Sequence, residues 1–574
     1  MKISIAKASG FCMGVRRAVE IGLDAANISR GNIYTYGPLI HNPQVLNLLK
    51  EKGITVVHDI PSGGSGTVII RAHGVTPEIK RNFEKEGFEI IDATCPHVIK
   101  VQNIIRKHAK QEYASIIIGD KNHPEVIGLL GYSGDKGYVV GKISDINSLP
   151  VFDKAIVVAQ TTQNRLLFRE IKDWITTEIP HYKIFDTICD STEKRQIEVN
   201  RLAKMVDVVI VVGGHSSGNT QRLADIAKQS GKPVYQIETE AELDAKALAS
   251  VKSVGITAGA STPNWIIKRV YRALETLLSK KNQGLSGYIY TIQRILMLTN
   301  IYLSVGAGCL CYAWSALQGA KHFFPPMSVS MLYVYSIHIF NNLTGVGADV
   351  FNDPDRASFY TRNKAVLEIL AGIAVVTGLI MSYTIGSVPF VILLFMSIMG
   401  LLYNLNFLPK SFISCKYQRI RDIPGSKTVL ISIAWGVVTA IIPVFYLQQK
   451  STTSVAVLLF VLSICLVFVR TSFFDILDMQ GDRIVGKETI AIILGEKRTV
   501  HLLKLVLLFI IAALFLASLF HFISSLGFAL LICPLFLLMI LLAYEHGYLL
   551  PSIKLEFYVE TNFILLGIIT FLWS

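Results

Sequence analysis

Three cysteines in the first half of the chain have the chemistry to hold a metal cluster. Cys12, Cys95 and Cys189 lie 83 and 94 residues apart, a spacing that indicates one cysteine in each lobe of a three-lobed domain. Three thiolates can ligate an iron–sulfur cluster and leave one iron open for a substrate. Because buried structural cysteines would be equally sparse, the spacing alone leaves a cluster and a purely structural role both open.

A second set of reactive residues follows short apolar segments that have the character of buried β-strands. Three of the six segments lead to His41, His73 and His123. The others lead to polar clusters that contain Gln160, Thr161 and Thr162, then Ser217, Gly218 and Asn219, and finally Ser261. In parallel α/β sheets, ligands bind beyond the carboxyl ends of the strands. Histidine, hydroxyl, amide and glycine backbone groups suit an anion such as phosphate.

The elements that must position these residues alternate along the first 280 residues. Short apolar strands are followed by amphipathic helices, the pattern of an α/β domain with parallel strands. Charged residues make up about 23% of this half, an ordinary soluble composition. The amino terminus lacks the apolar core of a secretory signal, and three cysteines fit a reducing compartment better than a disulfide framework.

The order of motifs in this half strongly resembles the family of 4-hydroxy-3-methylbut-2-enyl diphosphate reductases. The resemblance covers residues 1–281 and rests on eight motifs in sequence: Gly10-Phe11-Cys12-x-Gly14-Val15, Gly37-Pro38-Leu39-Ile40-His41-Asn42, Arg71-Ala72-His73-Gly74, Asp92-Ala93-Thr94-Cys95-Pro96, His123-Pro124-Glu125, Gln160-Thr161-Thr162, Thr187-Ile188-Cys189 and Gly259-Ala260-Ser261-Thr262-Pro263.

The resemblance implies a three-lobed fold around a central 4Fe–4S cluster on Cys12, Cys95 and Cys189. It also implies a diphosphate site that contains His41, His73, His123, Ser217, Asn219 and Ser261. Gly218 stands where many members have a second serine. Glu125 would deliver protons, and Thr161 would orient the hydroxyl group of the substrate. The implied reaction is reductive dehydroxylation of an allylic diphosphate, with electrons from a ferredoxin- or flavodoxin-like donor because no flavin or nicotinamide fingerprint is evident.

The second half of the chain has the composition of a membrane protein. Only about 11% of residues 285–574 are charged, and long apolar runs recur near the roughly 20 residues that cross a bilayer. We expect nine all-α spans, near residues 292–314, 328–346, 365–385, 387–406, 427–447, 452–470, 503–522, 524–543 and 557–573. The predicted division is therefore a domain over 1–281, a linker over 282–290 and a polytopic membrane domain over 291–574.

Charge between the expected spans predicts the orientation in the membrane. Lys and Arg gather in the even-numbered loops, and such residues stay on the cytoplasmic side. We expect a multi-pass protein of the inner, cytoplasmic membrane, in contact with lipid, with its first domain in the cytoplasm. The net charge of +13 is spread along the chain rather than clustered, so nucleic acid is not expected as a partner.

Acidic residues after the sixth expected span could hold a divalent cation. Asp475, Asp478 and Asp482 are spaced i, i+3 and i+7, which places them on one helical face. Like charges so arranged repel unless a cation lies among them, and Mg²⁺ held by carboxylates together with substrate phosphate is a common solution. A solvated loop helix is the alternative.

This segment closely resembles the second aspartate motif of the UbiA superfamily of intramembrane prenyltransferases. The resemblance covers about 290 residues and implies nine helices and Mg²⁺-dependent transfer of a prenyl group from a diphosphate. This chain departs from the first aspartate motif of that family. Only one of the three carboxylates is retained in the segment Asn341-Asn342-Leu-Thr-Gly345-Val-Gly-Ala-Asp349. Asp349 is therefore the candidate Mg²⁺ ligand on this side.

Three hypotheses remain for the whole chain. In the first, a reductase is joined to a prenyltransferase. In the second, the membrane half binds a prenyl chain or anchors the reductase without transfer. In the third, the first half is a non-redox binding module whose three cysteines hold zinc or nothing.

Overall fold

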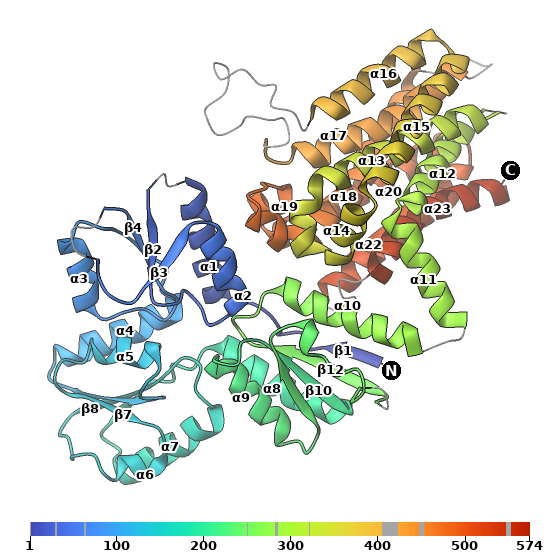
Figure 1. The fold of residues 1–574 in the computed structure, drawn as a ribbon. Helices are drawn as coiled ribbons and strands as arrows, with labels where there is room; N and C mark the ends of the chain where they lie inside the picture. Colours follow the sequence, from blue (N-terminus) through green and yellow to red (C-terminus); the bar gives the residue numbers. More distant parts are fainter. Residues whose placement is uncertain are drawn as a thin grey trace. The chain divides into compact units, whose positions relative to one another are not determined.

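The computed structural model describes residues 2–28, 31–61, 65–248, 251–281, 285–320, 322–403, 423–446, 453–546 and 553–573. The chain divides into two compact units, Met1–Leu278 and Ser279–Ser574, called here the α/β unit and the membrane unit (Figure 1). Of the predicted linker, residues 282–284 lie outside the described residues, and the remainder belongs to α11 (Leu285–Leu298).

Twelve strands form the sheets of the described α/β unit. They are β1 Lys2–Ile5, β2 Ile33–Tyr36, β3 Ile54–Val57, β4 Thr67–Ile70, β5 Glu89–Asp92, β6 Ala114–Ile118, β7 Gly137–Val140, β8 Ala155–Ala159, β9 Lys183–Ile184, β10 Val208–Val212, β11 Val234–Ile237 and β12 Ser253–Ala258. The helices are α1 Met13–Ile28, α2 Pro43–Glu51, α3 Pro77–Lys85, α4 Pro96–Ala109, α5 Pro124–Leu130, α6 Ile143–Ile146, α7 Arg165–Glu178, α8 Asp190–Met205, α9 Gly218–Lys228, the 3₁₀ helix η1 Glu240–Glu242 and α10 Asn264–Lys281.

These strands build three four-stranded sheets with one common topology. The orders are β3-β2-β4-β5, β7-β6-β8-β9 and β11-β10-β12-β1, and all pairs are parallel. If the strands of each lobe are numbered along the chain, with β1 counted last in its lobe, their spatial order in each sheet is second, first, third and fourth. In the last sheet the fourth position is taken by β1, from the opposite end of the unit. The sheets define three lobes, which confirms the predicted α/β class with parallel strands.

The central strands are apolar because helices cover both of their faces. All five residues of β6, β8 and β10 are buried, as expected for parallel sheets between helical layers. In the lobe of β6–β9, Ile116 and Val157 belong to one apolar cluster, whereas Ile117 and Val158 belong to another. This alternation fixes the register of the sheet and with it the positions of the loops at the carboxyl ends.

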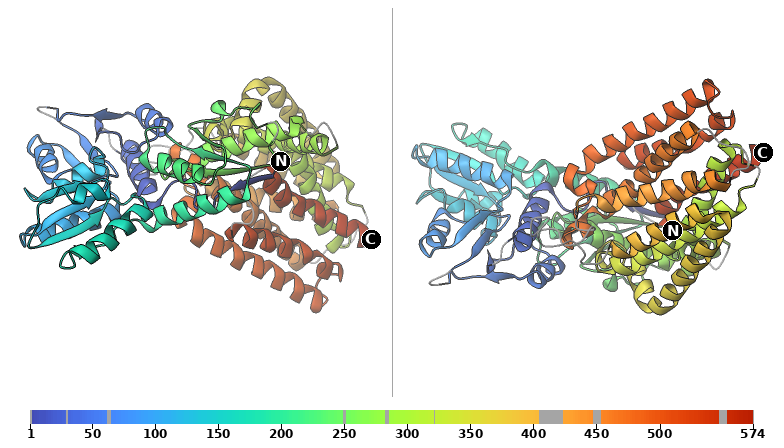
Figure 2. Two further views of the ribbon diagram at one scale, coloured as in Figure 1. Left: turned by 90° about the horizontal axis from the view of Figure 1, so that it is seen from below. Right: turned by 90° about the horizontal axis from the view of Figure 1, so that it is seen from above.

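The membrane unit is helical throughout its described residues. Its elements are α11, α12 Ile301–Leu317, α13 Phe324–Asn352, α14 Pro354–Arg362, α15 Lys364–Ile385, α16 Ser387–Leu402, α17 Ser426–Gly436, the π segment η3 Val437–Ile441, the 3₁₀ segment η4 Ile442–Tyr446, α18 Thr453–Ile484, α19 Ile490–Leu494, α20 Glu496–Leu519, α21 Leu526–Leu530, α22 Ile532–Glu545 and α23 Ile553–Trp573. Figure 2 shows the long helices of this unit side by side.

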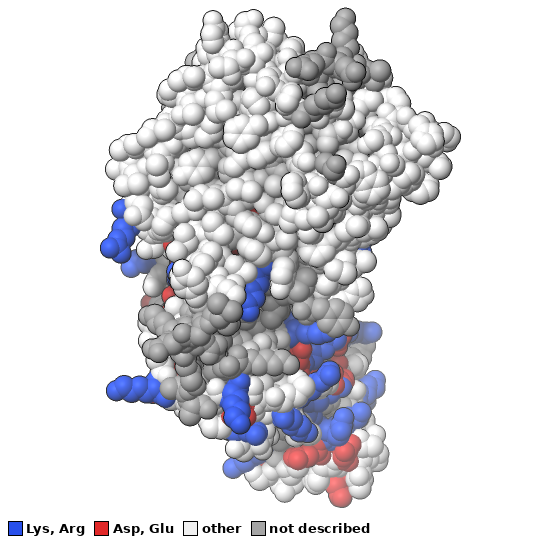
Figure 3. Space-filling view, turned by 90° about the vertical axis from the view of Figure 1, so that its right-hand side faces the viewer, with Lys and Arg blue, Asp and Glu red and all other residues white. Residues whose placement is uncertain are grey.

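Six helical segments of the described chain are long and apolar enough to cross a membrane, or seven if the bent pair Thr291–Leu298 and Ile301–Leu317 is one span. Many of their large apolar side chains are exposed, among them Val366, Ile373, Leu508 and Phe515, and the upper part of the face in Figure 3 is drawn in white, without Lys, Arg, Asp or Glu among its described residues. The structure thus supports a multi-pass membrane domain, while the predicted count of nine spans stays a prediction.

Two helices continue beyond the spans that the sequence predicts. The expected span 328–346 lies within α13, and residues 453–470 of the expected span 452–470 lie within α18; these helices end at Asn352 and Ile484. Both motifs with acidic residues therefore lie on the later turns of long helices, and Asp475, Asp478 and Asp482 share one helix as their spacing predicts. The physical reason is that polar residues at a helix end keep the backbone hydrogen bonds intact even where hydropathy falls.

Candidate functional site

The polar clusters of the α/β unit all follow the two inner strands of their sheets. His41 follows β2 and His73 follows β4, which are the first and third strands of one lobe. His123 and Thr161 follow the equivalent strands of the second lobe, and Ser217 and Ser261 those of the third: β6, β8, β10 and β12. First and third strands are neighbours where the strand order reverses, and this is where open α/β sheets bind ligands.

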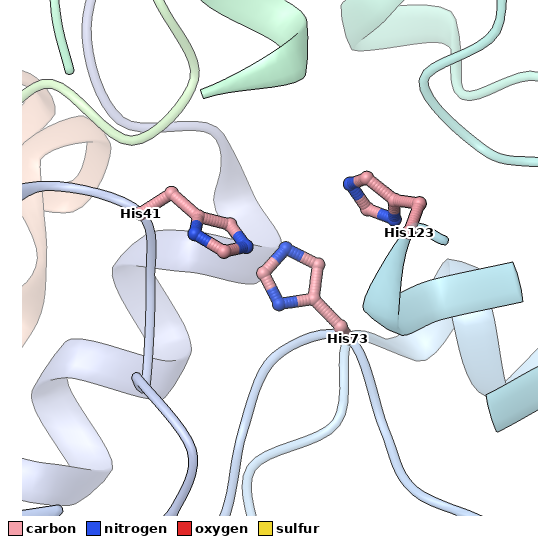
Figure 4. Close-up of side chains that lie close together, drawn as sticks. All are labelled: His41, His73 and His123. Carbon is pink, nitrogen blue, oxygen red and sulfur yellow. The ribbon is translucent and has the colours of Figure 1, made fainter. Parts of the chain in front are cut away.

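Three histidines from two lobes lie together (Figure 4). The ring centroids of His41 and His73 are 4.9 Å apart, those of His73 and His123 5.4 Å, and those of His41 and His123 6.2 Å. Burial lowers the pKa of all three, that of His123 to about 4, with repulsion from neighbouring histidines adding to the effect on His73 and His123. The three rings are therefore neutral in the absence of an anion.

The third lobe contributes hydroxyl and amide donors. The Ser261 hydroxyl donates to the His41 carbonyl oxygen at 3.0 Å and lies 3.5 Å from the Ser217 hydroxyl. Ser217 is the N-cap of α9, so Gly218 and Asn219 form the first turn of that helix, where N–H groups favour anions. Within the described chain, His73 Nδ1 and Asn219 Nδ2 are buried without a hydrogen-bond partner, which leaves both for a ligand.

The Glu125 carboxyl is held on the second lobe by Thr161. Its Oε1 accepts the Thr161 backbone N–H at 2.7 Å, and its Oε2 accepts the Thr161 hydroxyl at 2.9 Å. The Glu125 residue is only 2% exposed. Burial raises the pKa of its carboxyl to about 7, although both hydrogen bonds oppose the rise. A carboxyl in this state can hold a proton near neutral pH and release it to a bound molecule.

The cysteines occupy equivalent places in the three lobes. Each follows the fourth strand of its sheet: Cys12 follows β1, Cys95 follows β5 and Cys189 follows β9. Cys12 directly precedes α1, and the other two are the N-cap residues of α4 and α8. A thiolate at a helix N-terminus is stabilised by the helix dipole. All three thiols are free.

The surroundings of the thiols fit a cluster with three cysteine ligands. Gly14 leaves room for Cys95, because a Cβ at that position would lie 2.3 Å from the Cys95 sulfur. Cys95 interacts electrostatically with Cys12 and Cys189, and burial raises the pKa of its thiol. Three thiolates in one buried site would repel one another, so a cationic group must balance their negative charge.

Three arginines outside the predicted set of site residues also surround the site. Arg195 donates to the Gly10 carbonyl oxygen at 2.6 Å and interacts with Cys12 and Cys189. Arg222 connects the Thr162 carbonyl oxygen with the Asp120 carboxylate, at 2.5 and 2.7 Å. Arg71 acts on His41 and His73 through its charge.

Of these three arginines, only Arg71 could have been selected from the sequence, because it stands two residues before His73. Arg195 and Arg222 lie in the middle of helices, where a surface position is the usual expectation for arginine.

In the membrane unit, three cavities meet the ends of α13, α17 and α18. A polar cavity of about 110 Å³ is lined by His338, Arg356, Lys427, Asp475 and Asp478, among others. A second, of about 140 Å³, is lined by Asn342, Gly345, Asp349, Lys427 and Lys487, among others. A third, of about 250 Å³, is almost wholly apolar. Asn341 and Lys427 line all three.

Three of the four predicted Mg²⁺ ligands line these cavities, namely Asp475, Asp478 and Asp349, but the set fits the ion poorly. Asp475, Asp478 and Asp482 share α18, and Asp349 lies on α13. Among the described residues of this unit, no three acidic, histidine or cysteine side chains place ligand atoms within 4.8 Å of one another.

Protein donors already engage two of these carboxylates. Asp475 accepts the Thr428 hydroxyl at 2.6 Å, and Asp482 accepts the Asn352 amide at 3.3 Å with Lys487 3.5 Å away.

Fold and site together define two classes in one chain: an α/β unit of three equivalent parallel lobes and a helical membrane domain. The chain belongs to the LytB protein family, whose model matches residues 3–275, and carries a domain of the UbiA prenyltransferase family over residues 301–552. This assignment agrees with the resemblance of both halves.

Curated relatives and solved structures match the same two parts. A 4-hydroxy-3-methylbut-2-enyl diphosphate reductase of Alkaliphilus oremlandii is 43% identical over 280 residues, which cover 48% of this chain and 100% of the relative. The structure of a reductase from Plasmodium falciparum is 30% identical and covers 48% of this chain and 87% of its own, with a TM-score of 0.45. A UbiA homologue from Aeropyrum pernix is 12% identical and covers 47% and 98%, with a TM-score of 0.38.

Proposed function

We propose that the α/β unit reduces 4-hydroxy-3-methylbut-2-enyl diphosphate to isopentenyl and dimethylallyl diphosphate. The observation that carries the proposal is the 43% identity along the whole length of a curated reductase. Three histidines that lie together, a buried acid and three thiols, all of which follow the carboxyl ends of strands, support it. The reaction consumes two electrons and two protons, breaks the C–O bond of the allylic alcohol and releases water.

The substrate diphosphate is bound by the neutral donors at the inner strands. His41, His73 and His123 provide ring N–H groups, and their low pKa values rise when a diphosphate brings negative charge beside them. Ser217, Asn219 and Ser261 add hydroxyl and amide donors, and Gly218 adds its backbone N–H at the start of α9. Arg71 increases the positive potential beside the histidines.

Cys12, Cys95 and Cys189 would hold a 4Fe–4S cluster, which when bound supplies single-electron transfer and a Lewis-acidic iron. Arg195 balances the negative charge of the thiolates of Cys12 and Cys189 from within the protein. A ferredoxin- or flavodoxin-like protein is the proposed electron donor.

Glu125 is the proposed source of the proton that lets the oxygen leave as water. Its carboxyl is protonated below about pH 7, and Thr161 holds both of its oxygens. In the protonated state the carboxyl O–H points to the Thr161 hydroxyl, which can then donate to the substrate oxygen. Thr161 thereby orients the substrate and passes on the hydrogen bond.

The test of the reductase proposal is an anaerobic assay of the full chain in detergent. The chain is supplied with the hydroxylated diphosphate and a chemical reductant, and the C5 diphosphates are separated and quantified. Formation of both products is expected. A preparation with full iron content that forms neither product would refute the proposal.

For the membrane unit we propose binding of an isoprenyl diphosphate, with the polar cavities for the headgroup and the apolar cavity for the tail. Transfer of the prenyl group to an acceptor is the second candidate, favoured by the carboxylates of Asp475, Asp478 and Asp482 on one face of α18. The proposed location is the inner, cytoplasmic membrane in contact with lipid, with the α/β unit in the cytoplasm, as the loop charges indicate.

A further inference from the structure

Lys427 is a cationic residue that lies where the three cavities of the membrane unit meet. It is the second residue of α17 and lines all three cavities described above. Its side chain is exposed to these cavities, and it interacts electrostatically with Asp349, Asp475, Asp478 and Asp482. An ammonium group therefore lies among the four carboxylates for which the sequence predicts a divalent cation.

The charges around Lys427 are largely balanced within the chain. Arg356 lies 3.1 Å from Glu556 and 3.6 Å from Asp353. Lys487 lies 3.5 Å from Asp482. The carboxylates on the α13 side are fewer than in the UbiA family pattern, since Asn342 and Gly345 replace two of them. With fewer acidic ligands than that pattern and with the cations Arg356, Lys427 and Lys487 beside them, the site is poor in the ligands that Mg²⁺ needs and has the cations that an anionic headgroup needs.

We propose that Lys427 takes the place of the divalent cation, so that the membrane unit binds the headgroup of an isoprenyl diphosphate directly and without Mg²⁺. This inference rests on the proposed binding function of the membrane unit. The Lys427 ammonium offsets part of the negative charge of the carboxylates, which would otherwise repel the diphosphate, and provides three donors toward it.

The position of the apolar cavity supports an isoprenoid tail on the same ligand. The cavity is lined by Phe395, Met396, Leu430 and Trp435 among others, and Lys427 stands at the edge that it shares with the polar cavities. A molecule with an apolar chain and an anionic end would place its charge at the ammonium while its chain fills this cavity. Burial of the chain supplies affinity in proportion to its apolar area.

Binding of radiolabelled geranyl diphosphate to the full chain in phosphatidylcholine nanodiscs tests the proposal. The protein carries His41→Asn, which weakens the diphosphate site of the α/β unit. Affinity is measured with excess EDTA and, separately, with millimolar Mg²⁺. Equal affinity in both conditions is expected. Binding that disappears with EDTA and returns with Mg²⁺, or no binding in either condition, would overturn the proposal.

Substitution of Lys427 provides the second arm. Lys427→Gln should weaken binding about tenfold or more in both conditions, since one charge-assisted contact is lost, whereas Lys427→Arg should retain most of it. The matched control is Lys504→Gln, because Lys504 on α20 pairs with Glu545 and lines none of the three cavities. An unchanged affinity in Lys427→Gln would contradict the assignment.

A double variant that removes the ammonium group and restores a carboxylate tests the role of the metal directly. A Cβ at Gly345 would meet no heavy atom within 4 Å, so Gly345→Asp can return a carboxylate to the cavity without a clash. In the double variant with Lys427→Gln, binding is expected to become Mg²⁺-dependent. Equal binding with EDTA and Mg²⁺ in that variant would count against the proposal.

The reductase assay on the chain with His41 intact, in the same nanodiscs, separates the two proposals. Product formation depends on the α/β unit, so its absence would refute the reductase function while leaving the binding result intact. Conversely, a protein that reduces its substrate but binds geranyl diphosphate only with Mg²⁺ would keep the proposed function and lose this inference.

Discussion

Thr161 donates hydrogen bonds to both carboxyl oxygens of Glu125, from its backbone N–H at 2.7 Å and from its hydroxyl at 2.9 Å. The two residues come from different segments of one lobe, the end of β8 and the first turn of α5. The hydrogen bonds fix the direction of the carboxyl and lower its pKa, whereas burial raises the pKa to a net value of about 7. Substitutions of Thr161 and of Glu125 can therefore test the two contributions one at a time.

The pH profile of the reductase should report this acidity. Because Glu125 must be protonated to act as an acid and its pKa is raised to about 7, kcat/KM should fall about tenfold per unit above that pH. The Thr161 hydroxyl lowers the pKa of Glu125, so Thr161→Val should move this limb to higher pH. Steady-state kinetics between pH 6 and about 9 measure the shift. An unmoved limb in Thr161→Val would exclude Glu125 as its origin.

Glu125→Gln should keep the fold and lose turnover. An amide can accept the Thr161 N–H and direct its own N–H toward the hydroxyl, as the protonated acid does, but it has no proton to give. Turnover should fall by a factor of about 10² to 10⁴, with iron content and absorption spectrum unchanged. A kcat equal to that of the unmodified chain would show that the acid lies elsewhere.

The same substitution should change how stability depends on pH. Since the folded-state pKa of Glu125 lies above the usual value of 4.5, its contribution to stability is fully present below about 4.5 and is lost as pH rises through about 7. Glu125→Gln should therefore melt at a higher temperature than the unmodified chain at pH 8, but not at pH 5. Thermal unfolding followed by circular dichroism checks the difference, and equal melting temperatures at pH 8 would contradict it.

Loss of one thiol should prevent stable iron binding. Cys189→Ser removes the only cysteine of its lobe, so iron per chain should fall by about half or more after anaerobic purification. The matched control is Cys465→Ser on α18 of the membrane unit, which should leave iron content unchanged. Full iron content in Cys189→Ser would remove this residue from the ligand set.

Zinc should inhibit the reductase in competition with its substrate. The three histidines place ligand atoms within 4.8 Å of one another, and their lowered pKa values leave them neutral and able to coordinate. Micromolar Zn²⁺ should raise the apparent KM without lowering kcat, and EDTA should reverse the effect. The inhibition should be much weaker in His73→Asn. Inhibition that lowers kcat and persists in that variant would indicate a different zinc site.

The sequence anticipates the chemistry of the α/β unit well because that chemistry lies at strand ends. His41, His73 and Ser261 each follow an apolar run that has the length and branching of a buried strand. The equivalence of Cys12, Cys95 and Cys189 as successors of each fourth strand is not visible along the chain, since β1 joins its sheet from the other end of the unit.

The membrane unit is harder to anticipate, since hydropathy detects lipid-facing residues and not helix ends. Asp349 and Asp482 lie where α13 and α18 continue beyond the apolar runs, so the expected spans end before the helices do. In the sequence, Lys427 is only the first residue of the expected span 427–447, and no neighbouring residue indicates that its side chain lines a cavity. The tertiary fold alone brings it beside carboxylates from two other helices.

The division between the two units falls within the last turn of α10, between Leu278 and Ser279. Enzyme and membrane domain are thus portions of one translation product, and each ribosome that completes the chain makes one of each. Their ratio cannot be altered by promoter strength, messenger decay or unequal turnover. A cell that carries this chain cannot regulate the amounts of the two units independently, but it always makes them in equal numbers.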